Sequence, residues 1–235
     1  MKIKSKNAIK IRKAHRYLGL FLGVQFILWT ISGLYFSWTN IDEIRGEHLI
    51  KQNIKPKDFS ELISPSKLNQ SNIKSIELRV ISDTPYYWIN STFLFNAYTG
   101  ILKDSISKSE AVSIAQHNMV GDLKVESVNY ISNVDKHHEY RNKLLPAYVI
   151  SFEGMKKIKA YVSSSDGKFQ TVRHRNWRWF DFLWMTHTMD YESRDNFNNM
   201  LLRIFSLLGL VTVISGFTLW FISSPTIKKI LSRKA

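Results

Sequence analysis

The chain contains no cysteine among its 235 residues. This absence excludes disulfides, thiolate zinc sites, cysteine-ligated iron–sulfur clusters and a cysteine nucleophile. Several short signatures of enzyme chemistry are missing as well. No Gly-x-Gly-x-x-Gly follows a strand-like segment, and no P-loop, Gly-x-Ser-x-Gly or His-Glu-x-x-His occurs. These absences remove the usual motif-based assignments of catalytic function.

Acidic residues are absent from both ends of the chain. The residues before Tyr17 include seven Lys or Arg and those after Ile222 include four, so the ends hold 11 of the 33 basic residues and none of the 19 acidic ones. The net charge of +14 therefore arises mainly at the ends. It does not indicate a nucleic-acid partner, because the basic residues are not gathered in one patch with a recognisable binding motif.

Two long apolar runs separate these ends from the middle of the chain. Residues 17–38 would form a helix of about 33 Å, against a hydrocarbon core of about 30 Å, and residues 201–222 contain the second run. We expect both to be transmembrane helices, the first remaining as a signal anchor because no small-residue cleavage site follows it.

The charge asymmetry predicts the topology. By the positive-inside rule, the basic tails 1–16 and 223–235 are cytoplasmic and the segment between the helices lies outside, in the periplasm of a bacterial cytoplasmic membrane protein. The tails are too short to hold a nicotinamide or flavin domain. Any electrons that pass through the protein would come from quinol or another subunit.

The second half of the external segment has a clear order of patterns. Ser107 to Glu110 has the spacing of a capping box, and apolar residues then recur at helical intervals, which predicts a helix over 107–119. Segments rich in β-branched and aromatic residues follow and predict an antiparallel meander. The expected strands are 125–132, 147–152, 159–163 and 168–173, with a turn at Ser165-Asp166-Gly167.

The first half contains similar strand-like patterns. Alternating apolar residues begin at Ile76, and further strand-like stretches lead to a turn at Thr99-Gly100, 67 residues before Gly167. This repeat predicts two copies of one small unit, over 39–105 and 106–175. The expected fold class is an α+β membrane protein with a duplicated helix-plus-meander domain. The helix of the first copy is left open between 40–52 and 57–63.

Several short segments carry a resemblance to a known family. They are His15-Arg16-Tyr17-Leu18-Gly19, Asn96 to Gly100, Ser164 to Gly167 and Trp184 to Tyr191. They resemble the short, two-helix members of the PepSY-associated transmembrane proteins, also called iron-regulated membrane proteins. The resemblance implies PepSY domains outside the membrane. Larger relatives with four membrane helices are ferrisiderophore reductases that hold b-type haem, whereas this chain has half as many helices and no histidine inside either apolar run.

The resemblance makes His15 and His187 the candidate cofactor-binding residues, as axial ligands of the iron of haem b. His15 precedes the first run at the cytoplasmic edge, and its other interpretation is contact with lipid head groups. His187 lies on the outer side, in the aromatic segment 176–200, which is expected to lie on the membrane surface. The two would be roughly 30 Å apart, so bis-histidine ligation would require a homodimer or another membrane subunit.

The other histidines are weaker candidates. His174 is a third possible ligand, and His137 and His138 lie in a charged stretch that is typical of a solvated loop. His48 and His117 have no neighbours in sequence that suggest a role. No catalytic residue is assigned.

Small residues mark a further pattern in the apolar runs. Gly19 and Gly23 share a helical face with His15, and Thr212 and Gly216 form a similar pair in the second run. Such faces allow close helix contacts, either with each other or with a partner chain.

Two functions remain open at this point. The first is a haem-dependent electron-transfer component of ferric iron or ferrisiderophore reduction. The alternative is a non-enzymatic periplasmic binding or regulatory module, or an accessory subunit of a membrane complex.

The topology can be tested with single cysteines, because the chain has none of its own. In intact spheroplasts, an impermeant maleimide should label Ser165→Cys and should not label Ser5→Cys. The reverse labelling pattern would contradict the predicted orientation.

Overall fold

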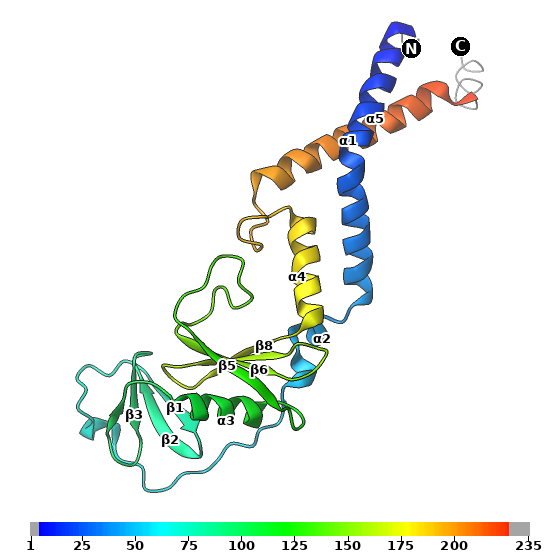
Figure 1. The fold of residues 1–235 in the computed structure, drawn as a ribbon. Coiled ribbons are helices and arrows are strands. Elements are labelled where there is room, and N and C mark those ends of the chain that lie inside the picture. Colours follow the sequence, from blue (N-terminus) through cyan, green and yellow to red (C-terminus); the bar gives the residue numbers. More distant parts are fainter. Residues whose placement is uncertain (1–4, 226–235) are drawn as a thin grey trace. The chain divides into compact units, whose positions relative to one another are not determined.

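The computed structural model describes residues 5–225, which divide into two compact units (Figure 1). A helical unit contains residues 5–38 and 181–225, and an α+β unit contains Thr39–Phe180. Each unit is described by itself. The basic residues Lys2, Lys4, Lys228, Lys229, Arg233 and Lys234, on which the predicted topology partly rests, lie outside the described residues.

The helical unit contains two helices that are long and apolar enough to cross a membrane, α1 (Ser5–Trp38) and α5 (Met200–Ser223). The sequence predicts a basic tail up to residue 16, but α1 is already helical from Ser5. No glycine or proline interrupts the chain before Gly19, and Lys, Arg and Ala favour a helix, so nothing ends it earlier. At α5, the Asn199 side chain caps the first turn by accepting from the Leu202 amide at 2.8 Å.

The aromatic segment 176–200 forms a helix followed by a loop. Helix α4 (Arg175–Thr188) begins in the α+β unit, and its part from Asp181 onward belongs to the helical unit. There it lies alongside the second half of α1 (Figure 1), with the Trp184 ring 5.7 Å from that of Phe36. Its expected position at a membrane surface stays a prediction.

The α+β unit contains two antiparallel sheets, each a four-stranded meander in sequential order. The second sheet agrees with the expected strands within one residue at each end. The first sheet consists of β1 (Ile76–Ile81), β2 (Thr84–Ile89), β3 (Phe93–Asn96) and β4 (Leu102–Lys103). The second consists of β5 (Val125–Ile131), β6 (Ala147–Phe152), β7 (Lys159–Ser163) and β8 (Phe169–Arg173).

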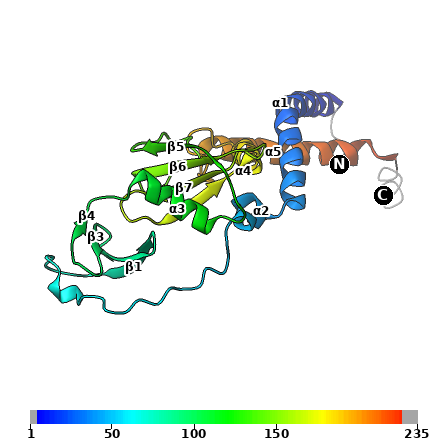
Figure 2. The same ribbon diagram turned by 60° about the horizontal axis from the view of Figure 1, so that its bottom comes forward.

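Helix α3 (Lys108–Asn118) lies between the two sheets (Figures 1 and 2). Its predicted capping box is confirmed: the Ser107 hydroxyl accepts from the Glu110 amide, and the Glu110 carboxylate accepts from the Ser107 amide at 2.6 Å. Ala111, Ile114 and Ala115 are buried on the helix. They join one core with Trp88 and Leu94 of the first sheet and with Ile150, Phe152 and Val162 of the second.

The two turn glycines occupy equivalent positions. Gly100 donates its amide to Asn96 and Gly167 to Ser163, and both glycines have positive φ angles, +73° and +68°. An added Cβ would also lie 2.9 Å from Ile63 at the first turn and from Ile81 at the second. Glycine is therefore required by both conformation and space.

The first copy lacks a helix equivalent to α3 at either of the two expected positions. Residues 57–63 contain no helix, and Leu62 and Ile63 instead pack on the outer face of the first sheet. Residues 40–52 contain only α2 (Ile41–Arg45), which Asn40 caps, and the 3₁₀ turn η1 (Glu47–Leu49). A further 3₁₀ turn is η2 (Pro65–Lys67). Apart from the turns, the two halves therefore share only the meander.

Stability of the α+β unit should depend on the shared core. Ile150 is fully buried, so Ile150→Ala should lower the free energy of unfolding of a Thr39–Phe180 fragment by about 2–4 kcal/mol in urea. As a control, Ile101→Ala removes a side chain that is 67% exposed and should cost less than about 0.5 kcal/mol. Equal effects of the two substitutions would contradict the described core.

Candidate functional site

The inward face of α1 repeats with alternating steps of four and three residues. Its residues are buried or half-buried, and His15, Gln25 and Ser32 among them are polar. An average step of 3.5 residues is the heptad geometry that keeps a helix in continuous contact with its neighbours. The face, here called the α1 seam, consists of Ile11, His15, Leu18, Leu22, Gln25, Trp29, Ser32 and Phe36.

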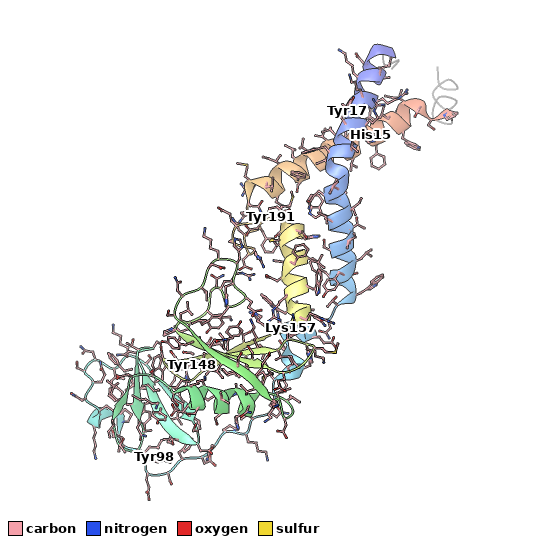
Figure 3. All side chains as sticks on the ribbon, in the orientation of Figure 1. His15, Tyr17, Tyr98, Tyr148, Lys157 and Tyr191 are labelled. Carbon is pink, nitrogen blue, oxygen red and sulfur yellow. The ribbon has the colours of Figure 1, made fainter. Side chains whose placement is uncertain are left out.

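His15 lies where α1 meets α5 (Figure 3). Its Nδ1 is 3.1 Å from the Thr212 carbonyl oxygen and 2.8 Å from the Ser215 hydroxyl. The Ser215 hydroxyl donates to the same carbonyl at 2.7 Å, so both oxygens accept and Nδ1 must carry the proton. Nε2 forms no hydrogen bond with any residue in the range 5–225. The ring packs on Gly216, where an added Cβ would lie 3.0 Å from Cε1.

His187 has a matching arrangement near the other end of the α1 seam. Its Nδ1 is 2.7 Å from the Ser32 hydroxyl, and that hydroxyl donates to the Leu28 carbonyl at 2.6 Å. Ser32 therefore accepts from Nδ1–H, which again leaves the Nε2 lone pair free. The ring lies edge-on to Phe36 at 5.5 Å, and burial lowers the pKa of His187, so the imidazole is neutral near pH 7.

Side chains satisfy the last carbonyl groups of α4. Gln25 Nε2 donates to the Thr186 carbonyl at 3.1 Å, and Trp29 Nε1 donates to the His187 carbonyl at 2.7 Å. Asn199 donates to the Thr188 carbonyl at 2.9 Å. The last four carbonyls of a helix have no partner within it, and three of them here receive a donor from elsewhere in the helical unit. This end of α4 can therefore lie away from water.

The motif Thr186 to Tyr191 has a structural role beyond His187. Asp190 is buried and accepts from the Ser193 hydroxyl and from three backbone amides, those of Glu192, Ser193 and Asn196. Arg194 pairs with the buried carboxylate of Asp181 on α4. These contacts fold the loop between α4 and α5.

The small-residue pairs differ in what they contact. Gly216 lies against His15, and the Thr212 carbonyl bonds to it, so this pair does mark the α1–α5 contact. An added Cβ on Gly19 or Gly23 would meet no atom within 4 Å. The α1 pair therefore does not contribute to close packing against any described residue.

Haem can be tested against both imidazoles. In each, an oxygen accepts from Nδ1–H and Nε2 has no hydrogen-bond partner among residues 5–225, so each would serve as a single ligand to iron. They cannot share one iron, because His15 and Ser32 are 17 residues apart on one helix, or about 26 Å. Within residues 5–225, no three His, Cys, Asp or Glu side chains are grouped as a metal site.

The remaining histidines have structural surroundings or are exposed. His174 is buried, and its Nε2 lies 3.1 Å from the carbonyl oxygens of both Glu43 and Ile44. His138 Nδ1 accepts from the Tyr140 amide, whereas His137 and His117 are exposed. His48 lies edge-on to His174, with ring centres 5.8 Å apart.

A charged cluster around Glu139 is absent from the sequence-based list of candidates. Glu139 accepts from Arg178 through both carboxylate oxygens, at 2.6 and 3.1 Å, and from the Tyr161 hydroxyl at 2.7 Å. Lys159 lies 3.1 Å away. Burial opposes ionisation, but the hydrogen bonds and charges of these partners outweigh it and lower the pKa of Glu139 to about 2. Asp135 to Glu139 looks like a solvated loop in sequence, and no local signal distinguishes its last residue.

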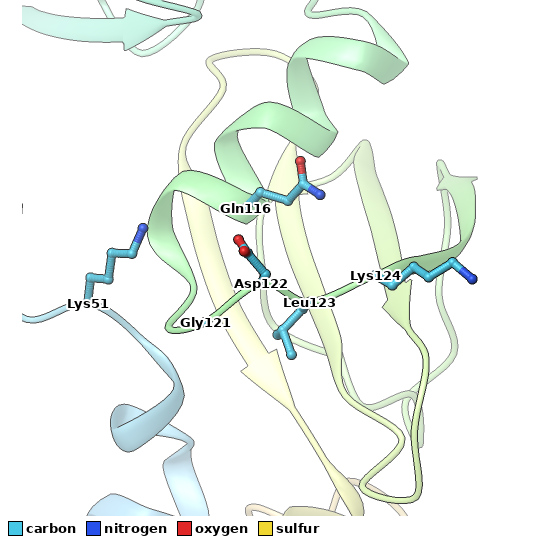
Figure 4. Close-up of a pocket in the computed structure, with 6 residues that line it drawn as sticks. All are labelled: Lys51, Gln116, Gly121, Asp122, Leu123 and Lys124. Carbon is cyan, nitrogen blue, oxygen red and sulfur yellow. The ribbon is translucent and has the colours of Figure 1, made fainter.

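One hollow in the α+β unit has no cluster of reactive side chains pointing into it. It has a volume of about 590 Å³ and lies at the end of α3 (Figure 4). Lys124 lines it but points away and pairs with Glu153 at 3.0 Å. Lys51 lies at the opposite side. The hollow is lined by Lys51, Gln116, Gly121, Asp122, Leu123 and Lys124.

Comparison with known proteins gives no relative. No protein-family model, curated protein or solved structure matches the chain. The class that the fold supports is an α+β protein with two antiparallel sheets and two helices able to span a membrane.

The Glu139 cluster predicts a pH dependence. The folded pKa of about 2 lies below the unfolded value of about 4.3, so the carboxylate contributes stability above pH 4.3 that is lost as the pH falls towards 2. Glu139→Gln should therefore destabilise the α+β unit by on the order of 2–3 kcal/mol at pH 7 and by much less at pH 2.5. Urea unfolding at both values measures this.

The matched control is Glu126→Gln, at an exposed position of β5. It should change stability little at either pH. A Glu139→Gln effect that is the same at pH 7 and pH 2.5 would contradict the role of the ionised carboxylate.

Proposed function

We propose that this protein is a membrane-anchored binding module, which presents an α+β domain to a partner protein outside the cytoplasmic membrane. The observation that carries the proposal is an apolar stripe on β1. Ile76, Leu78 and Val80 are 42–44% exposed on this edge strand. A contiguous exposed apolar surface can mark a protein-binding site, and an edge strand adds free backbone donors and acceptors.

The stripe follows from the local topology. The three residues pair across from Ile89, Tyr87 and Pro85 of β2, and Tyr87 and Ile89 are buried under residues 62–73. That covering segment protects the middle of the sheet face and leaves its β1 edge uncovered. In this proposal the two meanders of a PepSY-like duplication form one binding domain, and only the second half has kept its helix.

The two long helices act as the anchor in this proposal. With the basic ends in the cytoplasm, residues 39–180 would lie in the periplasm, at the outer side of the bacterial cytoplasmic membrane. The polar groups of the α1 seam support an anchoring role, because His15, Gln25, Trp29 and Ser32 all bond to other parts of the helical unit.

A second candidate is a haem-dependent electron-transfer component of ferric iron or ferrisiderophore reduction. The His15 and His187 side chains favour it, since an oxygen orients each ring through Nδ1 and leaves Nε2 without a hydrogen bond to any described residue. Bound haem would supply one-electron transfer. The chain itself would orient the ligands and exclude water, with a homodimer or another membrane subunit completing the iron coordination.

The binding proposal is tested by crosslinking in cells. A photo-reactive residue at Leu78 of the full-length protein should yield one discrete adduct with another protein. The control is the same residue at Val120, which is equally apolar and 48% exposed but lies apart from the stripe. The double variant Ile76→Lys/Val80→Lys should abolish the Leu78 adduct.

An absorption spectrum of the protein purified from haem-replete cells separates the two candidates. The binding module should show no Soret band. Two results together would contradict the binding proposal and favour electron transfer. They are a Soret band that is lost in both His15→Ala and His187→Ala, and equal crosslinking at Leu78 and Val120.

A further inference from the structure

A second hollow in the α+β unit combines cationic side chains from separate segments. It has a volume of about 350 Å³ and is lined by Glu43, His48, Lys156, His174, Arg175 and Asn176. These residues come from α2 and η1, from the connection between β6 and β7, and from the start of α4. The volume is in the range of small-molecule sites in proteins.

Backbone contacts fix the walls of this hollow. The carbonyl oxygens of Glu43 and Ile44 only accept, so Nε2–H of His174 donates to both and holds α2 against the start of α4. The Arg175 amide donates to the Lys156 carbonyl at 2.9 Å, and Arg178 donates to the next carbonyl, that of Lys157, also at 2.9 Å. The three segments are therefore held together without using the side chains of Lys156 and Arg175.

Those two cations lack a charge partner. Neither Lys156 nor Arg175 forms an ion pair with any carboxylate among residues 5–225, in contrast to Arg178 and Lys159, which pair with Glu139. His48 and Asn176 add N–H donors. Glu43 is the one carboxylate in the lining, so the balance of fixed charge is positive.

We propose that this hollow binds a phosphate group, with Arg175 and Lys156 as charge partners and with His48 and Asn176 as further donors. The guanidinium fork matches two phosphate oxygens at once, and the ammonium acts as a point charge. The phosphate is either that of a lipid head group or that of a soluble monoester. A lipid is considered because four residues separate Trp38, the end of α1, from Glu43.

Two measurements on the full-length protein distinguish these sources. Calorimetric titration of the protein in phosphatidylcholine nanodiscs with glycerol 3-phosphate measures binding of a soluble phosphate monoester. Native mass spectrometry, after extraction from membranes of phosphatidylcholine and phosphatidylglycerol, reports retention of an anionic lipid. Binding in either measurement identifies the source.

The variants decide whether that binding occurs in the hollow. Lys156→Ala/Arg175→Ala should weaken the affinity or the lipid retention at least tenfold, and Glu43→Gln should strengthen it. The charge-matched control Lys67→Ala/Lys108→Ala removes two exposed cations elsewhere in the unit and should have no effect. Unchanged thermal melting of each variant, followed by circular dichroism, excludes unfolding as the cause.

Three outcomes would overturn the proposal. They are no binding of either probe by the unmodified protein, an equal loss in the control variant, and weaker binding by Glu43→Gln.

Discussion

The end of α4 imposes the constraint on which the helical unit depends. A helix that ends away from water leaves carbonyl groups without partners, at a cost of about 1–3 kcal/mol each. Gln25, Trp29 and Asn199 supply the donors for Thr186, His187 and Thr188. Two of these donors lie on α1 and one at the start of α5, so satisfying one helix end joins all three helices.

The same constraint explains why the seam of α1 is polar at several positions. A purely apolar seam would pack well but could not donate hydrogen bonds, and interhelical hydrogen bonds are among the interactions that hold membrane helices together. Ser32 and His15 extend this pattern by bonding to His187 and to the Thr212 carbonyl. The histidines therefore have a structural explanation that requires no cofactor, and their free Nε2 atoms are compatible with one.

Local signals in the sequence predict much of the fold. The capping box at Ser107, the meander strands and the turn glycines Gly100 and Gly167 are all encoded within a few residues, and the structure contains each of them. The two apolar runs are likewise long helices. The missing first helix is different, because Leu62 and Ile63 bury against a sheet that follows them in sequence.

The candidate sites are harder to predict because they depend on distant residues. His187 is a candidate in sequence through the family resemblance and its aromatic surroundings, but its hydrogen-bond partner Ser32 is 155 residues away. Glu139 pairs with Arg178 across 39 residues, and the alternation that identifies β1 as a strand does not reveal that its apolar side chains are exposed. The periodicity of apolar residues in the sequence indicates secondary structure. Burial and side-chain pairing depend instead on which helices and strands pack together in the fold.

The position of α3 between the two sheets also bears on how the domain is made. Residues 76–103 emerge from the ribosome before α3 does, so the inner face of the first sheet has no helix to cover it when its strands are complete. Ile81, Trp88 and Leu94 of that face stay open to water until Ala111 to Ala115 arrive. Folding of the first meander therefore depends on the chain that follows it, and until α3 covers this apolar face the face is exposed to aggregation.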